Sequence, residues 1–234
     1  MEPCYEDAYT AIEERHPFFV ARRELFAGLL SGAEREAVLD IGCGTGTLLA
    51  HLKRLGFLRL AGVETSSRLR ERLRDPSIPI HAELPPGPFD RILMLDVLEH
   101  IEDDSRAMRE VRERLEEGGR FYVSVPAHPF LWSAHDEQNR HVRRYRKREL
   151  VARIEAAGFE IEKLSYWNAL AFPAICAARL LRLSGPRQTD LEIGGRFSLR
   201  LYGHVLRLEE RLVRRFDLPF GVSLILVARR RAER

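Results

Sequence analysis

The sequence predicts an α/β fold in which a doubly wound, mostly parallel sheet carries helices on both faces. Short apolar runs alternate with stretches of helical spacing along most of the 234 residues. The runs are short and continuous, which is typical of strands buried on both faces. The first run, residues 37–41, leads directly into a glycine-rich turn and then a helix. This order of elements favours parallel strands joined by helices.

Each element follows from its residues in turn. A helix is expected over residues 8–30, with a break near Pro17. Ser66 is expected to begin another helix, and Gly118 and Gly119 to end the helix that starts at residue 103. The remaining helices are expected over residues 48–55, 66–74, 103–115 and 147–157, and the strands over residues 37–41, 58–63, 78–82, 91–95, 120–125, 159–166 and 222–227.

The chain is expected to form a single domain over residues 1–234, with N-terminal cap helices in residues 1–33. Its core takes in residues 34–167 and 219–230. Between them, residues 168–218 read as a helical insertion. They comprise an apolar helix, a loop with Gly and Pro at residues 184–195, and an amphipathic helix over residues 199–216.

Composition narrows the class of protein. The formal net charge is only +3, so no strong field for nucleic acid follows. Three cysteines (Cys4, Cys43 and Cys176) stand far apart without a CxxC pair, which favours a reducing compartment. The longest apolar stretch, residues 169–183, is short and contains Pro and Arg, so it is not expected to span a bilayer. The sequence therefore predicts a cytoplasmic protein, monomeric or homodimeric.

The strongest signal is the turn after the first strand, where Gly42, Gly44 and Gly46 alternate with other residues. Glycines allow a sharp turn and let a ligand approach the main chain. Asp40 lies just inside the turn, where a carboxylate can take up a ligand amine. Glu64 follows at the end of the second strand, where an acid can hold ribose hydroxyls. A dinucleotide site would need GxGxxG, and here the third glycine comes one residue early.

The run from Val38 to Gly46 resembles the first motif of class I S-adenosylmethionine-dependent methyltransferases, and the resemblance covers about residues 10–168 and the last strand. It implies a Rossmann-like, seven-stranded sheet with the last strand antiparallel. It also implies S-adenosylmethionine as cofactor, with S-adenosylhomocysteine as product. The implied contacts are Asp40, Gly42, Gly44 and Gly46 in the turn, Glu64 at the ribose, and Thr65, Ala82 and Glu83 near the adenine. After the third strand, near the adenine, the family often has the run Asp-Ala-Glu, where this chain has His81, Ala82 and Glu83.

The loop after the fourth strand holds Asp96, Val97, Glu99 and His100, and it should face the transferred methyl group. The resemblance implies cofactor contacts at Asp96 and Val97. Acid-x-x-Glu-His also resembles the metal site of ubiquinone-type O-methyltransferases and small-RNA methyltransferases. Because Asp96 stands where those enzymes tend to have Glu, and related chains carry Leu-Glu-His-Ile without a known metal, the sequence favours no metal, with His100 as a catalytic candidate.

The loop after the fifth strand should wall the acceptor site and supplies two further catalytic candidates, His135 and His141. His135-Asp136 and His141 with Arg143-Arg144-Tyr145 resemble a branch of bacterial glycan and lipid-pathway methyltransferases. The alternative is a solvated loop. On the N-terminal helix, Arg22 or Arg23 is expected either to meet the cofactor carboxylate or to form a solvated basic edge.

The predicted function is methyl transfer to a small-molecule, lipid or glycan acceptor, more often at oxygen than at nitrogen or carbon. Two alternatives stay open: an RNA or protein methyltransferase, and a catalytically silent ligand-binding protein. The insertion, residues 168–218, offers either a lid over a long apolar acceptor that also touches a membrane surface, or an ordinary core with a solvated face or a dimer contact. Glu209, Glu210 and Asp217 dilute its basic charge and favour the second interpretation.

Overall fold

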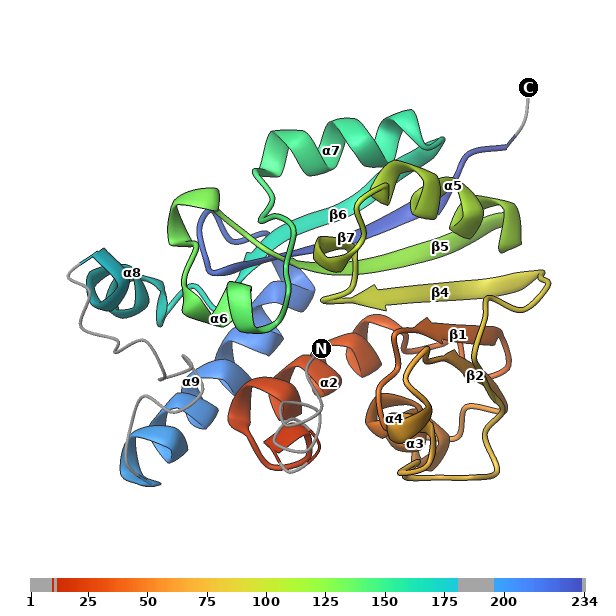
Figure 1. Cartoon of the computed structure of the whole chain (residues 1–234), viewed down its shortest axis with the longest axis horizontal. Helices are drawn as coiled ribbons and strands as arrows, with labels where there is room; N and C mark the ends of the chain where they lie inside the picture. Colours follow the sequence, from red (N-terminus) through yellow and green to blue (C-terminus); the bar gives the residue numbers. More distant parts are fainter. Residues whose placement is uncertain (1–9, 11, 181–195, 233–234) are drawn as a thin grey trace.

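A computed structural model describes residues 10, 12–180 and 196–232 of the chain (Figure 1). Its centre is a seven-stranded sheet in the order β3-β2-β1-β4-β5-β7-β6, in which β7 runs antiparallel to both β5 and β6. This confirms the predicted doubly wound sheet with an antiparallel last strand. The strands are β1 (Ala37–Ile41), β2 (Arg59–Val63), β3 (Ile80–His81), β4 (Phe89–Leu95), β5 (Leu115–Pro126), β6 (Phe159–Trp167) and β7 (Ser223–Arg230).

Helices cover both faces of the sheet, and each face has its own hydrophobic core beneath its helices. On one face α2 (Pro17–Leu29), α3 (Thr47–Arg54) and α9 (Arg196–Arg215) pack together. On the other face lie α5 (Asp104–Arg114) and α7 (Lys147–Ala156), which Figure 1 shows above the sheet. The shorter helices are α4 (Ser67–Arg70), α6 (Ala134–Gln138) and α8 (Phe172–Leu180), with 3-10 turns η1 (Leu98–His100) and η2 (Pro129–Leu131).

Local sequence explains several helix ends. Pro17 occupies the first turn of α2, and His16 caps it by accepting a hydrogen bond from the amide of Phe18. The Ser66 side chain accepts from the amide of Leu69, as the predicted cap requires. Asp103 caps α5 in the same way through the amide of Arg106.

The sequence had suggested that Gly118 and Gly119 end a helix, but in the structure they do not. The helix α5 already stops at Arg114, and Leu115 is extended and pairs with Phe89 in the sheet. Leu115 is buried in the core on the α5 side, so it favours joining β5 over continuing the helix. Gly118, with φ +74°, then serves an irregular stretch of β5.

The helical insertion forms largely as expected, although α9 begins at Arg196, three residues before the predicted start. The predicted loop at residues 184–195 lies outside the described residues. Over the part of the chain that is described, no helix is long and apolar enough to cross a bilayer. The single-domain division and the cytoplasmic location stay predictions.

Candidate active site

The carboxyl ends of β1, β2, β4 and β5 meet along one edge of the sheet, and nearly all the predicted site residues follow them. The strand β1 pairs with β2 on one side and with β4 on the other. The chain therefore changes direction across the sheet at β1, and such a switch point is where open α/β sheets bind ligands. Of the predicted set, Ala82 and Glu83 follow β3, and His135 and His141 come from a more distant segment after β5.

The glycine-rich turn is held in a conformation that suits glycine. Gly42, Gly44 and Gly46 have φ of +74°, +58° and +74°. A Cβ at Gly42 would lie 2.5 Å from a methyl group of Val97. The turn therefore presents main chain, with no side chain in between, next to the loop that follows β4.

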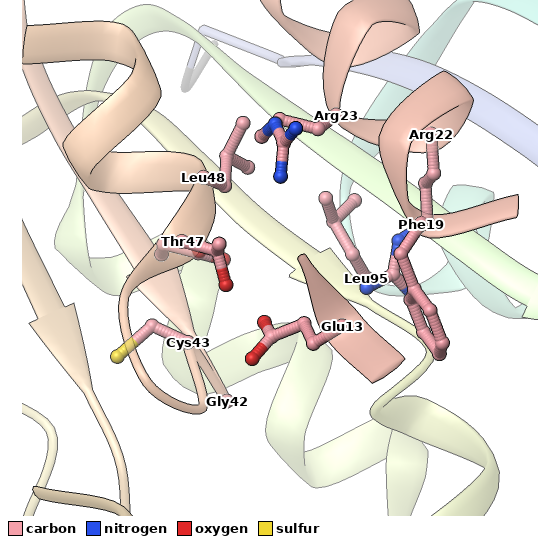
Figure 2. Close-up of a pocket in the computed structure, with 10 residues that line it drawn as sticks. Glu13, Phe19, Arg22, Arg23, Gly42, Cys43, Thr47, Leu48 and Leu95 are labelled. Atoms are coloured by element: carbon pink, nitrogen blue, oxygen red, sulfur yellow. The ribbon is translucent and has the colours of Figure 1, made fainter. Parts of the chain in front are cut away.

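A pocket opens beside this turn, lined by Asp40, Gly42, Cys43 and Thr47 from the β1 side and by residues from the N-terminal segment (Figure 2). It encloses about 430 Å³, counting the solvent at its mouth. The remaining lining residues are Glu13, Phe19, Arg22, Arg23, Leu48 and Leu95.

Acidic and basic groups face each other across the pocket. Burial raises the pKa of Asp40 to about 7, Arg22 opposes this shift, and Glu13 and Glu64 add to it. The Nε of Arg23 is buried and has no hydrogen-bond partner among the described residues. A pocket with carboxylates and an available guanidinium suits a ligand that carries both an ammonium and a carboxylate.

Arg22 does not point freely into the pocket, because it forms an ion pair with Asp96 at the end of β4. The hydroxyl of Ser124 donates to the same carboxylate at 2.8 Å. Asp96 itself has φ +58°, an uncommon backbone conformation for a residue with a side chain. Asp96 therefore ties α2 to β4 and β5 at the pocket's edge.

Glu64 is nearly buried and fixed by two main-chain amides, those of Gly44 at 3.0 Å and Ser66 at 2.8 Å. It lies beside the turn, as predicted, but outside the lining of the pocket. Thr65 is exposed next to it, and Ala82 and Glu83 are exposed directly after β3. These residues continue the edge of the sheet from the pocket towards β3, so the predicted cofactor contacts form one line along that edge.

A second cluster lies after β4, where Glu99, His100 and His141 bring their ligand atoms within 4.8 Å of one another. Glu99 is fully buried, and neither of its carboxylate oxygens has a hydrogen-bond partner among the described residues. Burial and then the charge of Asp96 raise the pKa of Glu99 well above its ordinary value. A buried carboxyl without partners calls for a proton or a cation. The sequence did not anticipate that His141 completes this cluster.

His141 is held by a buried carboxylate. Its Nδ1 lies 2.9 Å from Oδ1 of Asp136, which also accepts from Nε of Arg144 at 2.7 Å. Burial raises the pKa of Asp136, but the hydrogen bond from His141 and the charge of Arg144 outweigh it and keep the pKa below its ordinary value. An ionised Asp136 accepts a hydrogen bond from Nδ1 of His141 and so orients the imidazole ring.

The rings of His100 and His141 lie 4.7 Å apart, and those of His135 and His141 6.2 Å apart. Desolvation and the neighbouring His141 lower the pKa of His100 to about 4. The three predicted catalytic histidines therefore form one group. His100 is neutral at physiological pH, as a metal ligand must be.

Other residues of this loop hold it in place. Arg143 forms an ion pair with the buried Asp104 at 2.8 Å, and the hydroxyl of Tyr145 donates to the same residue at 2.7 Å. Arg144 also donates to the main chain of Ala127 at 3.1 Å. Arg143, Arg144 and Tyr145 thus anchor the loop, while His135 and His141 remain the residues that could meet an acceptor.

Sequence reasoning expected the N-terminal helix with Arg22 and Arg23 at the cofactor, but it missed Glu13 and several residues beside the turn. Glu13 accepts a hydrogen bond from the hydroxyl of Thr45 at 2.8 Å, so a residue from before α2 reaches the glycine-rich turn. Cys43, Thr47, Leu48 and Leu95 also line the pocket without having been predicted. No local motif marks Glu13, because its partner lies 32 positions away.

Comparisons of sequence place the chain among known proteins. The model of the methyltransferase domain family matches residues 12–164, well over half of the chain. A mitochondrial ubiquinone biosynthesis O-methyltransferase of Candida albicans is 33% identical over 109 residues, which are 40% of this chain and 33% of that protein. The corresponding enzyme of Xanthomonas oryzae pv. oryzae is 31% identical over 110 residues, 41% of this chain and 44% of that protein. The chain thus matches less than half the length of these curated relatives.

Solved structures share the fold. An S-adenosylmethionine-dependent methyltransferase from Mesorhizobium loti has a TM-score of 0.60 at 20% identity, over 93% of this chain and 99% of that one. The [4+2]-cyclase SpnF has a TM-score of 0.53 at 18% identity, over 97% of this chain and 81% of that one. The fold by itself therefore does not fix the reaction. The family model, matched from the N-terminal segment to β6, does identify the family: the chain belongs to the methyltransferase-domain family of class I S-adenosylmethionine-dependent methyltransferases.

Proposed function

We propose that the protein transfers the methyl group of S-adenosylmethionine to a hydroxyl oxygen of a small-molecule or lipid-linked acceptor. The grouping of Glu99, His100 and His141 at the carboxyl end of β4 carries this proposal. Glu99 and His100 belong to the loop after β4, which the resemblance places beside the methyl group. Relatives that are O-methyltransferases of ubiquinone biosynthesis support oxygen as the acceptor atom.

The pocket suits the amino-acid end of the methyl donor. Asp40 would take up the ammonium, directly or through water, and Arg23 would take up the carboxylate, because its buried Nε lacks a partner among the described residues. Glu64, fixed by two amides, would hold the ribose hydroxyls. Gly42 keeps the main chain open at the point where a Cβ would meet Val97.

The buried carboxyl of Glu99, which has no hydrogen-bond partner within the described part of the chain, fits a hard divalent cation, with His100 and His141 as further ligands. When bound, such a cation supplies Lewis-acid chemistry that lowers the pKa of a hydroxyl group. The chain's own contribution is to orient the ligands. Asp136 orients the imidazole ring of His141, which a metal ligand and a general base both require.

Methyl transfer asks little more of the chain than alignment. The methyl donor is already an activated sulfonium, and positioning two reactants can be worth an effective concentration of about 10⁵–10⁸ M. The walls on either side of the acceptor, η1 and the loop that carries His135 and His141, are fixed by Tyr145 and Arg144. The hydroxyl oxygen of Tyr145 also lies 3.2 Å from the main-chain oxygen of Leu98 in η1.

The test is a methyl-transfer assay with S-adenosylmethionine and matched pairs of hydroxyl and amine acceptors, read by mass spectrometry. We expect product from the hydroxyl compounds, loss of turnover after chelation, and recovery with Mg²⁺ or Mn²⁺. His141→Ala should lower turnover about 100-fold, as losses around metal ligands and bases typically do. His204→Ala, an exposed histidine on α9, is the matched control and should leave turnover unchanged.

Three outcomes would change the proposal. Methylation of amines alone would replace oxygen as the acceptor atom. Turnover that survives chelation but falls in His141→Ala would make His141 a base and remove the metal. Methylation of RNA or protein, with no small-molecule product, would favour the alternative that the sequence left open.

A further inference from the structure

We propose that α9 docks the protein on the surface of a bilayer that contains anionic lipids, an interaction separate from methyl transfer. The helix has 20 residues, so it is about 30 Å long. It lies along α2, on the face of the sheet opposite α5 and α7 (Figure 1). One side of it faces the protein core, through Leu206 and Val213.

A second apolar side of the same helix faces outward. Leu201, Leu208 and Leu212 are 57%, 54% and 37% exposed, and Phe216, one residue past the helix, is 63% exposed. Their spacings of seven, four and four residues place them on one face. A helix that leaves a second row of large apolar side chains in water has a surface that a partner would cover.

Basic side chains flank this exposed row. Arg200, Arg207, Arg211 and Arg215 are exposed on α9, and His204 lies among them. At 100° per residue they fall together on the side adjacent to the leucines. The outward surface of α9 therefore combines an apolar row with an arginine row, the arrangement of helices that lie in a membrane interface.

Two of the three acidic residues that the sequence had counted against a membrane contact are turned inward, whereas Asp217, past the end of the helix, is exposed and pairs with Lys163 at 2.7 Å. Glu209 is fully buried, and its carboxylate accepts from the amides of Ala169 at 2.8 Å and Leu170 at 3.2 Å. Glu210 is also buried and pairs with Arg214 at 3.1 Å. These are the only two acids in α9. The described surface of the helix therefore carries no exposed carboxylate, and its charge has one sign.

The charge on the outward surface of α9 distinguishes between the partners that could cover it. Two copies of α9 packed through their leucines would bring arginines against arginines without an acid to pair with them, which disfavours a dimer here. A nucleic acid would neutralise the arginines but leave the leucines in water. A bilayer with anionic headgroups satisfies both rows, because phosphates meet the arginines while the leucines enter the acyl boundary.

The experiment is co-sedimentation of the full chain with vesicles of phosphatidylcholine alone and of phosphatidylcholine mixed with phosphatidylglycerol. Binding is expected only to the mixed vesicles, and it should weaken as salt is added. The double variant Arg207→Gln with Arg211→Gln should bind about 30-fold more weakly, since each arginine near an anionic surface is worth about 1 kcal/mol. The double variant Leu208→Ser with Leu212→Ser should bind the mixed vesicles at least about tenfold more weakly.

The matched control, Arg109→Gln with Arg148→Gln, removes the same charge from exposed positions on α5 and α7. It should bind as the unchanged protein does. Equal losses in the control and in the α9 variant would overturn the proposal, as would equal binding to neutral vesicles. Sedimentation velocity without lipid tests the other occupant: a dimer that the leucine variant dissociates would show that a second copy covers this face.

Discussion

At the glycine-rich turn, Gly42 combines a φ of +74° with a close approach to Val97. Alanine here meets two costs, the left-handed backbone and a Cβ placed 2.5 Å from the valine methyl. We expect Gly42→Ala to lower the free energy of unfolding by about 2–4 kcal/mol. It should also abolish binding of S-adenosylhomocysteine, measured by calorimetry.

Gly56 provides the matched control. It has φ +95°, but a Cβ there would meet nothing within 4 Å. Gly56→Ala should therefore cost only the backbone strain, about 1 kcal/mol, and leave ligand binding unchanged. Equal ligand affinities in the two variants would show that the turn is not where the ligand touches the main chain.

Asp40 predicts a pH dependence of cofactor binding. Burial raises its pKa to about 7 in the free protein, so it is largely protonated at pH 6. A ligand ammonium favours the ionised form, so binding lowers that pKa and releases a proton. Affinity should therefore fall as the pH drops below 7, by about eightfold between about pH 7.5 and about pH 6.

Calorimetry at the two pH values, in buffers of different ionisation enthalpy, measures both the affinity and the released proton. In Asp40→Asn the affinity should be weaker and the eightfold change should vanish. Asp75→Asn replaces an exposed carboxylate paired with Lys53 and should keep that change. The same pH dependence in Asp40→Asn would mean that another group titrates.

At single positions, the sequence predicted the residues whose place follows from the local order of strands and turns. Asp40, Gly42 and Glu64 follow from the order of strand, turn and strand. Glu13 and the partnership of His141 with Glu99 could not be predicted, because they depend on how distant segments pack. The role of Arg22 was predicted only in part, since its ion pair with Asp96 joins residues 74 positions apart.

Among the elements, α9 shows how burial changes the meaning of a charge. In sequence, Glu209 looks like one more acid on a basic helix. In the structure it caps the amides of Ala169 and Leu170 beyond the end of β6. Burial raises its pKa, as these amides only partly compensate. An acid at this position fastens α9 to the segment that directly follows β6, which no periodicity of the helix reveals.

We therefore expect Glu209→Ala to lower the free energy of unfolding by about 2–4 kcal/mol, because two amides near the end of β6 lose their acceptor. Thermal unfolding followed by circular dichroism measures the loss. Glu155→Ala, an exposed acid on α7, is the control and should stay within about 0.5 kcal/mol of the unchanged protein. If both variants unfold alike, Glu209 does not anchor α9.

Boundaries of elements were likewise predictable where the local sequence sets them and not where tertiary packing does. The strands β1 and β4 were predicted closely because their apolar runs are continuous. The helix α5 ends within one residue of its predicted end, but the start of β5 was missed, because Leu115, a core residue, joins the sheet before the glycines. Tertiary packing there outweighs the local helix-ending signal.

For the molecule as a whole, the pocket joins two parts that are distant in the sequence. One wall comes from the turn after β1, and the other from Glu13 and the helix α2. The helix α2 is held from outside by α9 and from inside by the ion pair of Arg22 with Asp96. A ligand that contacts both walls should therefore stabilise the native state and restrain the N-terminal segment together with the sheet.

The last prediction measures this coupling. At a concentration about 100 times its dissociation constant, S-adenosylhomocysteine should stabilise the protein by about 2.7 kcal/mol. For a chain of this size, that raises the midpoint of thermal unfolding by about 5–10 °C. NAD at the same concentration should leave the midpoint unchanged, because the turn lacks the spacing of a dinucleotide site. Hydrogen exchange should slow in α2 as well as in the turn after β1. Slowing confined to the turn would mean that α2 does not contact the ligand, and a larger shift with NAD would contradict the assigned cofactor.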